Sequence, residues 1–224
     1  HRTYRCQCLI DEAWADFFRE NRFLVGISLD GTRSLHDMNR VDVKGKGTWA
    51  AVERALRLLE KKQVEYNILC VITGAAARRG QAIYQSLTGL GCRYLQFIAC
   101  LDPMEEERGQ RPFSLTPERY GTFLKTVFDL WSRDWEQGNY VSVRLFDDYV
   151  HLLAGRPASA CASNGVCGQY FVAEGDGSIY PCDFFVLDEY RMGKLGEQTL
   201  AELADSPAAR EFCACGRGAP EECT

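Results

Sequence analysis

The strongest constraint on the fold is an alternation of short apolar runs with amphipathic segments in the first half of the chain. Apolar runs at residues 23–29, 66–73 and 94–100 predict buried strands. Apolar residues recur every three or four positions in 48–62, which predicts a helix, and residues 80–90 predict a second one. Strands that are joined by crossover helices run parallel. The sequence therefore predicts an α/β fold, which binds ligands at the carboxyl ends of its strands.

Helices are also expected outside this alternation. Residues 9–21 predict a short helix before the first strand, and residues 114–135 predict a long amphipathic helix with Pro117 at its first position. A further helical stretch is expected from about residue 141 to residue 153. Two threonines are in position to cap helices: Thr48 and Thr116.

The pattern changes after Gly155. Two β-like runs flank residues 174–177, whose sequence Glu-Gly-Asp-Gly is typical of a hairpin turn. Residues 199–212 then predict a short helix. The last third of the chain is therefore expected to form a small hairpin region that is distinct from the parallel sheet.

Composition excludes some classes of function. A net charge of −5 and an isoelectric point near 5.4 argue against a nucleic-acid partner, because such proteins usually carry a basic patch. No apolar run approaches the roughly 18 residues that span a bilayer, so no membrane association is expected. The sequence begins at His1 rather than at a methionine, and we expect it to be part of a longer protein.

Eleven cysteines are too many to be incidental, and six of them lie in the last 64 residues. Cys161, Cys167 and Cys182 follow a C-x5-C-x14-C spacing, and the last two bracket the predicted hairpin. A hairpin returns its ends to one place, which favours a [4Fe–4S] cluster or a tetrahedral zinc. A disulfide with one free thiol is the alternative. The cysteines in or beside apolar runs are expected to be small core residues: Cys70, Cys92 and Cys100.

Two motifs give the chain a family resemblance. The segment CASNGVCGQYFVAEGDGSIYPCDFF, followed by YRMGKLGEQTLAEL, resembles the start of the SPASM domain of radical S-adenosylmethionine enzymes, and more narrowly of the anaerobic sulfatase-maturating enzymes. The segment GISLDGTRSLHDMNR, residues 26–40, resembles the fourth-strand segment of the barrel in the same family. The resemblance extends from about Ile10 to Cys223.

The resemblance implies three parts. Residues 1–112 would be the C-terminal part of a partial (β/α)6 radical S-adenosylmethionine barrel. Residues 113–160 would be connecting helices. Residues 161–224 would be the N-terminal part of a SPASM domain that binds auxiliary clusters.

The resemblance also implies roles for individual residues. The positions that match S-adenosylmethionine contacts are Ser28, Arg40 and Leu101. The ligands of the first auxiliary [4Fe–4S] cluster would include Cys161, Cys167 and Cys182, and Cys223 would be the first ligand of a second cluster. Asp183 matches the proposed general base. From the residues alone, Asp183 is better interpreted as a surface acid in a turn or helix cap, and Arg40 as a surface charge. Ser28 is equally a strand-end hydroxyl that caps the Asp30–Gly31 turn.

The implied activity is oxidation of a Cys or Ser of a sulfatase polypeptide to formylglycine, in the cytoplasm and with an electron donor. The cofactors would be S-adenosylmethionine and [4Fe–4S] clusters. Two other interpretations stay open: a SPASM maturase of another ribosomal peptide, and a non-catalytic metal-binding remnant.

Several positions depart from the family pattern. The C-x3-C-x2-C motif of the radical-generating cluster is absent, so the chain alone is expected to be inactive. Residues 1–8, HRTYRCQC, replace the usual Q-T-N-G strand end, and Thr32 stands where Pro is usual. Cys213 and Cys215 have no counterpart, and we expect neither to bind a cluster.

Overall fold

The computed structural model describes residues 9–103, 107–168 and 170–215. The chain forms two compact units, the first running to Asp147 and the second beginning at Asp148. The finer division that the resemblance implies, with boundaries at residues 112 and 160, stays a prediction.

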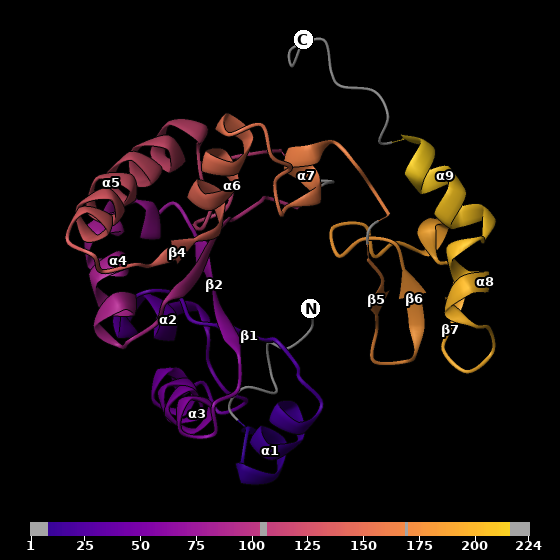
Figure 1. The fold of residues 1–224 in the computed structure, drawn as a ribbon, viewed down its shortest axis with the longest axis horizontal. Coiled ribbons are helices and arrows are strands. Elements are labelled where there is room, and N and C mark those ends of the chain that lie inside the picture. The colour runs from indigo at the N-terminus through magenta and orange to yellow at the C-terminus, as the bar shows by residue number, and fades with distance from the viewer. Residues whose placement is uncertain (1–8, 104–106, 169, 216–224) are drawn as a thin grey trace. The chain divides into compact units, whose positions relative to one another are not determined.

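The first unit contains a mixed series of helices and strands (Figure 1). In chain order they are α1 (Glu12–Glu20), β1 (Val25–Ser28), α2 (Arg33–Asn39), α3 (Trp49–Lys61), β2 (Tyr66–Ile72), the 3-10 helix η2 (Ala76–Arg79), α4 (Gly80–Gly89), β3 (Tyr94–Ala99), α5 (Pro117–Glu136), β4 (Ser142–Val143) and α6 (Arg144–Leu153), which continues into the second unit.

The sheet of this unit has the strand order β1-β2-β3-β4, and every neighbouring pair is parallel. The predicted parallel α/β fold is therefore confirmed. The prediction of a helix from residue 141 was wrong at its start, because Ser142 and Val143 form β4 and the helix begins at Arg144. Val143 is fully buried and pairs with Leu95 of β3, and this pairing outweighs the helical pattern around it.

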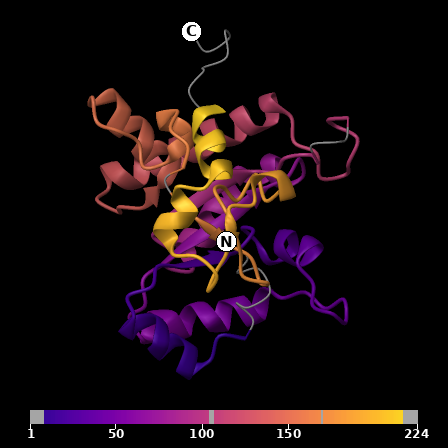
Figure 2. The same ribbon diagram turned by 90° about the vertical axis from the view of Figure 1, so that its right-hand side faces the viewer.

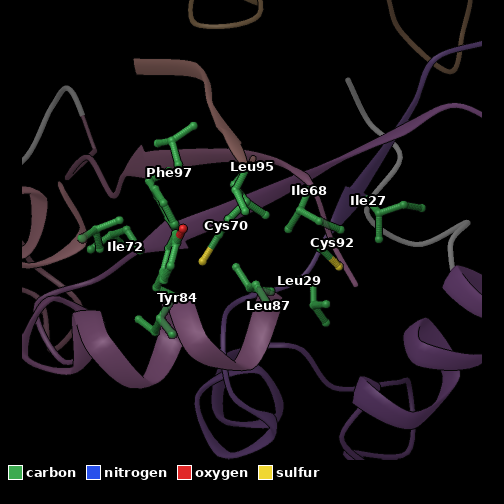
Figure 3. Packing of buried hydrophobic residues seen from close by; sticks show 14 of the residues in the cluster. Ile27, Leu29, Ile68, Cys70, Ile72, Tyr84, Leu87, Cys92, Leu95 and Phe97 are labelled. Atoms are coloured by element: carbon green, nitrogen blue, oxygen red, sulfur yellow. The ribbon is translucent and has the colours of Figure 1, made fainter. Parts of the chain in front are cut away.

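Strand side chains on one face of the sheet form the main core with the crossover helices (Figure 3). Ile68, Cys70 and Ile72 alternate along β2 and are fully buried, and Leu87 of α4 packs in the same cluster. Cys70 and Cys92 are core residues, as expected, and burial raises the pKa of the Cys92 thiol to about 12. These two thiols are therefore structural and inert.

Of the two threonines that were expected to cap helices, Thr116 does so and Thr48 does not. Thr116 accepts a hydrogen bond from the Arg119 N–H at 3.4 Å, and Pro117 is the first residue of α5. Thr48 does precede α3, but its side chain makes no capping bond. Its hydroxyl instead donates to the carbonyl oxygen of Arg40 at 3.0 Å, so this threonine joins α3 to the end of α2.

The turn after β1 needs a glycine for two reasons. Gly31 has a φ of +70°, which costs little only without a side chain. A Cβ at this position would also lie 2.6 Å from the Cγ1 atom of Ile83. The Asp30–Gly31 pair therefore lets α4 pack closely against the carboxyl end of β1.

The second unit contains short elements, three of which form an antiparallel sheet. The elements are α7 (Cys161–Asn164), β5 (Val172–Ala173), β6 (Ser178–Tyr180), the 3-10 helix η3 (Asp188–Tyr190), β7 (Gly193–Lys194), α8 (Leu200–Ala204) and α9 (Pro207–Cys215). The sheet has the order β5-β6-β7. The last helices of this unit are yellow in Figure 2. The predicted hairpin is confirmed as β5 and β6.

The predicted helix over 199–212 is divided into α8 and α9. Ser206 stands between the two helices, and its hydroxyl accepts a hydrogen bond from the Ala209 N–H at 3.2 Å. Pro207 begins α9 because proline fits the first turn of a helix, where its missing N–H is not needed. Ile179, Met192 and Leu203 are buried together and form the small core of this unit.

Candidate cofactor and cluster sites

The first candidate site lies at the carboxyl edge of the parallel sheet. Ser28 is the last residue of β1 and is 1% exposed. It pairs in register with Leu69, and the alternation along β1 places it on the face opposite the Ile27 side chain, which belongs to the core. Leu101 follows β3 by two residues and is 67% exposed. Both residues are therefore at the strand ends where parallel folds bind ligands.

The loop after Leu101 is held by a carboxylate. Asp102 accepts hydrogen bonds from the Ser114 hydroxyl at 2.6 Å and from the Gly109 N–H at 2.8 Å. The hydrogen bond from Ser114 is the main reason why the pKa of Asp102 lies below its usual value. This carboxylate fixes the backbone beside Leu101.

Arg40 is paired with a buried carboxylate. Its Nε atom donates to Asp30 Oδ2 at 2.5 Å and its Nη2 atom to Oδ1 at 3.3 Å. Asp30 Oδ1 also accepts the N–H of Val71 in β2 at 2.9 Å. The pair therefore joins the end of α2 to β1 and β2. Its side chains are only 19% and 9% exposed, so Arg40 is not the surface charge that the residues alone allowed.

His36 completes this network as a neutral side chain. Its Nδ1 atom accepts the Asp30 N–H at 3.3 Å, and its Nε2 atom lies 3.0 Å from the Thr48 hydroxyl. Because the Thr48 hydroxyl hydrogen is donated to Arg40, Nε2 is the atom that carries the imidazole proton. Burial lowers the pKa of His36 below its usual value, which agrees with a neutral ring.

The second candidate site lies at the end of the β5–β6 hairpin. Cys182 and Asp183 follow β6 directly after Pro181. The Tyr170 hydroxyl donates to Asp183 Oδ1 at 2.6 Å and lies 3.7 Å from Cys182 Sγ. The Cys182 thiol is itself 3.9 Å from Asp183 Oδ1. Desolvation, followed by the hydrogen bond to Asp183, raises the pKa of Tyr170 well above its usual value, so this phenol remains a donor.

Cys161 is presented by a backbone turn that a buried carboxylate holds. Asp148 of α6 is 2% exposed and accepts the N–H of Ser159 at 2.6 Å and of Ala160 at 3.2 Å. The Asn164 side chain bonds both the N–H and the carbonyl of Ala158, at 2.9 and 2.6 Å. Two side chains therefore fix the residues that lead into Cys161 at the start of α7.

Cys213 lies against the backbone beside Cys167. Gly168 has a φ of +80°, and a Cβ on it would overlap Cys213 Sγ. Cys213 of α9 is therefore close to the Cys167 turn. The expectation that Cys213 is not a cluster ligand stays a prediction, as does the same expectation for Cys215.

The donor set suits an iron–sulfur cluster. Cys161, Cys167 and Cys182 are partly exposed, and the structure shows no disulfide among these three cysteines. Thiolates are the usual ligands of such clusters. Within residues 9–103, 107–168 and 170–215, no three Cys, His, Asp or Glu side chains are close enough to hold one metal ion. Convergence of the three thiols therefore stays a prediction, and Cys223 lies outside the described residues.

Sequence reasoning missed two residues of these sites. Tyr170 was not recognised, although extending the Val172–Tyr180 register by two residues on each side places it opposite Cys182. Arg144 was also missed; it contacts Gln96, which pairs in register with Leu69, the partner of Ser28. The Arg144 Nη1 atom donates to Gln96 Oε1 at 3.2 Å, and Gln96 alternates in β3 with the core residues Leu95 and Phe97. The signal in the sequence was Gln96, a polar residue between two core residues of β3, which needs a polar partner.

Comparisons with known proteins agree with the iron–sulfur chemistry that the cysteine motif suggests. The SPASM model, described as an iron–sulfur cluster-binding domain, matches residues 161–224. The cysteine-type anaerobic sulfatase-maturating enzyme of Clostridium perfringens (strain 13 / Type A) is 46% identical over 96% of this chain and 58% of its own length. The serine-type enzyme of Klebsiella aerogenes is 33% identical over 91% of this chain and 50% of its own length.

A solved structure extends the agreement to the fold. The structure of native anSMEcpe with bound AdoMet and Kp18Cys peptide is similar to this chain, with a TM-score of 0.89 and 45% identity over 97% of this chain and 60% of that one. The chain therefore spans little more than half the length of the relatives that it matches. Among the described helices, none has the length and apolar character to cross a bilayer.

Proposed function

Because the chain is homologous to the anaerobic sulfatase-maturating enzymes, we propose that it is part of a radical S-adenosylmethionine enzyme that oxidises a Cys or Ser of a sulfatase to formylglycine. The observation that carries this proposal is the contact between a carboxylate, Asp183, and the thiol of Cys182 at the end of the hairpin. The reaction needs a base and an electron acceptor beside one carbon. Asp183 would be the base, and Cys182 would be a ligand of the cluster that accepts the electron.

In the proposed reaction, bound S-adenosylmethionine and [4Fe–4S] clusters supply the radical that removes a Cβ hydrogen and accept the electron that the substrate loses. The residues of this chain have the remaining tasks. Ser28 and Leu101 would border S-adenosylmethionine at the sheet edge, and Arg40, which is held by Asp30, would be a further contact. Cys161, Cys167 and Cys182 ligate the first auxiliary cluster, and Cys223 belongs to the second.

Asp183 acts as the general base that takes the S–H or O–H proton of the substrate. Both of its contacts, with Tyr170 and with Cys182, use Oδ1. Within the part of the chain that the structure describes, Oδ2 makes no hydrogen bond to another residue. Oδ2 is therefore the oxygen that we assign to the substrate proton.

The partners of the complete enzyme are a sulfatase polypeptide and an electron donor, in the cytoplasm, where thiols stay reduced. The greater identity to the cysteine-type relative, 46% against 33%, favours cysteine as the target. A serine target is the second possibility, and a different ribosomal peptide is the third.

The test is a peptide-oxidation assay with the full-length protein. The protein, loaded with iron and sulfide, is incubated anaerobically with S-adenosylmethionine, a reductant and matched sulfatase peptides that carry Cys, Ser or Ala at the target position. We expect an aldehyde, trapped with a hydrazide and located by mass spectrometry, from the Cys peptide and none from the Ala peptide. If 5′-deoxyadenosine forms but neither the Cys peptide nor the Ser peptide gains an aldehyde, the protein acts on another substrate.

A further inference from the structure

The hairpin end contains a side chain for which the proposed function has no role. Tyr170 stands two residues before β5, and Cys182 stands two residues after β6. Because Val172 pairs with Tyr180, the antiparallel register places Tyr170 directly opposite Cys182. The Tyr170 side chain therefore faces the proposed ligand and the neighbouring base as a result of strand pairing.

The Tyr170 hydroxyl contacts both of these groups. It donates its single hydrogen to Asp183 Oδ1 at 2.6 Å, and its oxygen lies 3.7 Å from Cys182 Sγ. A hydrogen bond from a neutral donor to a carboxylate is short and strong and fixes the rotamer of the acid. Asp183 is otherwise an exposed side chain, which has several rotamers of similar energy.

We propose that Tyr170 is a positioning residue that holds the Asp183 carboxylate beside Cys182, with Oδ2 turned toward the substrate. This inference rests on the proposed function, since it assigns Asp183 to the substrate proton. The hydroxyl oxygen also lies 3.7 Å from the Cys182 sulfur while its hydrogen is directed at Asp183, so its partial negative charge faces the proposed ligand, and polar groups near cluster sulfurs are among the factors that set the reduction potential of a cluster. One tyrosine thus acts on the base and on the electron acceptor.

The test is Tyr170→Phe in the full-length, cluster-loaded enzyme, with Tyr149→Phe as the matched control. Tyr149 is an exposed tyrosine of α6, and the control removes the same atom. We expect Tyr170→Phe to lower kcat roughly 10-fold or more, as loss of a hydrogen bond to a charged group does, with little change in KM. Iron and sulfide content should equal that of the wild type.

A double variant shows whether Tyr170 acts through Asp183. In an Asp183→Asn background, Tyr170→Phe should cause little further loss of kcat, because the carboxylate that it orients is already gone. Multiplicative losses in the double variant would overturn the proposal. Loss of iron from Tyr170→Phe would also overturn it, since Tyr170 would then only support the ligand loop.

The reduction potential separates this inference from the proposed function. It is measured by electron paramagnetic resonance without substrate. We expect Tyr170→Phe to shift an auxiliary cluster to a more positive potential, because the partial negative charge of the hydroxyl oxygen beside the Cys182 sulfur is removed. An unchanged potential together with wild-type kcat would exclude the role of Tyr170. Failure of the wild-type enzyme to form any aldehyde would instead overturn the proposed function, and the potential would still report on the Tyr170–Cys182 contact.

Discussion

At the scale of single residues, the Asp183 carboxylate is where structure and proposed chemistry meet most directly. In the complete enzyme, Asp183→Asn preserves the size of the side chain and removes the base. We expect turnover to fall roughly 10²–10⁴-fold, which is the usual range for loss of a general base. Iron content should stay near the wild-type value, because Asp183 is not proposed as an iron ligand. Cys182→Ala is the contrasting variant and should lose iron as well as activity.

Arg40 has a structural task that is measurable without any cofactor. Arg40→Ala leaves the Asp30 carboxylate buried without its guanidinium partner, and we expect a loss of about 3 kcal/mol in the free energy of unfolding, measured with urea. Arg57→Ala is the matched control, because Arg57 pairs with Glu53 on an exposed helix face and should change stability little. Equal losses in the two variants would show that burial does not strengthen the Asp30–Arg40 pair.

His36 makes the stability of the chain depend on pH. Burial lowers its pKa in the folded state below the unfolded value of 6.5, so the unfolded chain binds a proton first as the pH falls. The stabilising contribution is complete above pH 6.5 and is lost as the pH falls from 6.5 toward the lower pKa of the folded state. Each unit of difference between the two pKa values corresponds to about 1.4 kcal/mol.

The measurement for His36 is urea unfolding at pH 7.5 and pH 5.5. We expect the wild type to be less stable at pH 5.5, and His36→Gln to lose most of that difference. His151→Gln, on the exposed part of α6, is the control and should keep the pH dependence of the wild type. A His36→Gln variant with the full wild-type dependence would assign the effect to other groups.

At the scale of elements, strands and helices that are long enough to show a periodic pattern of apolar residues were predictable from the sequence. Most elements of only two residues were not. β2 and α5 have clear periodic patterns and appear where they were expected. β4, β5 and β7 have two residues each, which is too few for any alternation to show. β5 was nevertheless predicted, because the Glu-Gly-Asp-Gly turn marks its hairpin, whereas β4 and β7 have no such turn.

The candidate sites show the same division. Ser28 and Leu101 were placed by family motifs, and the structure puts them at strand ends. Tyr170 could be found only once the hairpin register was known, since the residue pair depends on where the turn lies. Asp148 lies 13 positions before Cys161, within a helix whose sequence pattern does not mark this residue. Only the folded chain shows that Asp148 holds the turn that precedes Cys161.

The turn before α7 depends on α6 through this carboxylate. In Asp148→Asn, one carbonyl oxygen must replace two carboxylate oxygens that accept backbone N–H groups. We expect faster hydrogen exchange at the amides of Ser159 and Ala160, with a local loss of about 1–3 kcal/mol. Asp147→Asn, one position away and bonded to Ser142, should leave those two amides protected. Unchanged exchange in Asp148→Asn would mean that Asn164 alone holds the turn.

At the scale of the whole molecule, the two units divide the proposed chemistry. The first unit contains the sheet edge with Ser28 and Leu101, where a bound cofactor would lie. The second contains the hairpin with the proposed ligands and the proposed base, and it has a small core of its own.

The 224-residue chain alone is expected not to cleave S-adenosylmethionine. None of its eleven cysteines forms the C-x3-C-x2-C arrangement that the family resemblance requires for the radical-generating cluster. Without those three thiolates, the cluster that gives an electron to S-adenosylmethionine lacks its ligands. The chain is supplied anaerobically with iron, sulfide, reductant and S-adenosylmethionine, and 5′-deoxyadenosine is measured by chromatography beside the full-length protein. Formation of 5′-deoxyadenosine by the chain alone would show that its other cysteines support the cleavage, and would remove the basis for assigning them to electron acceptance.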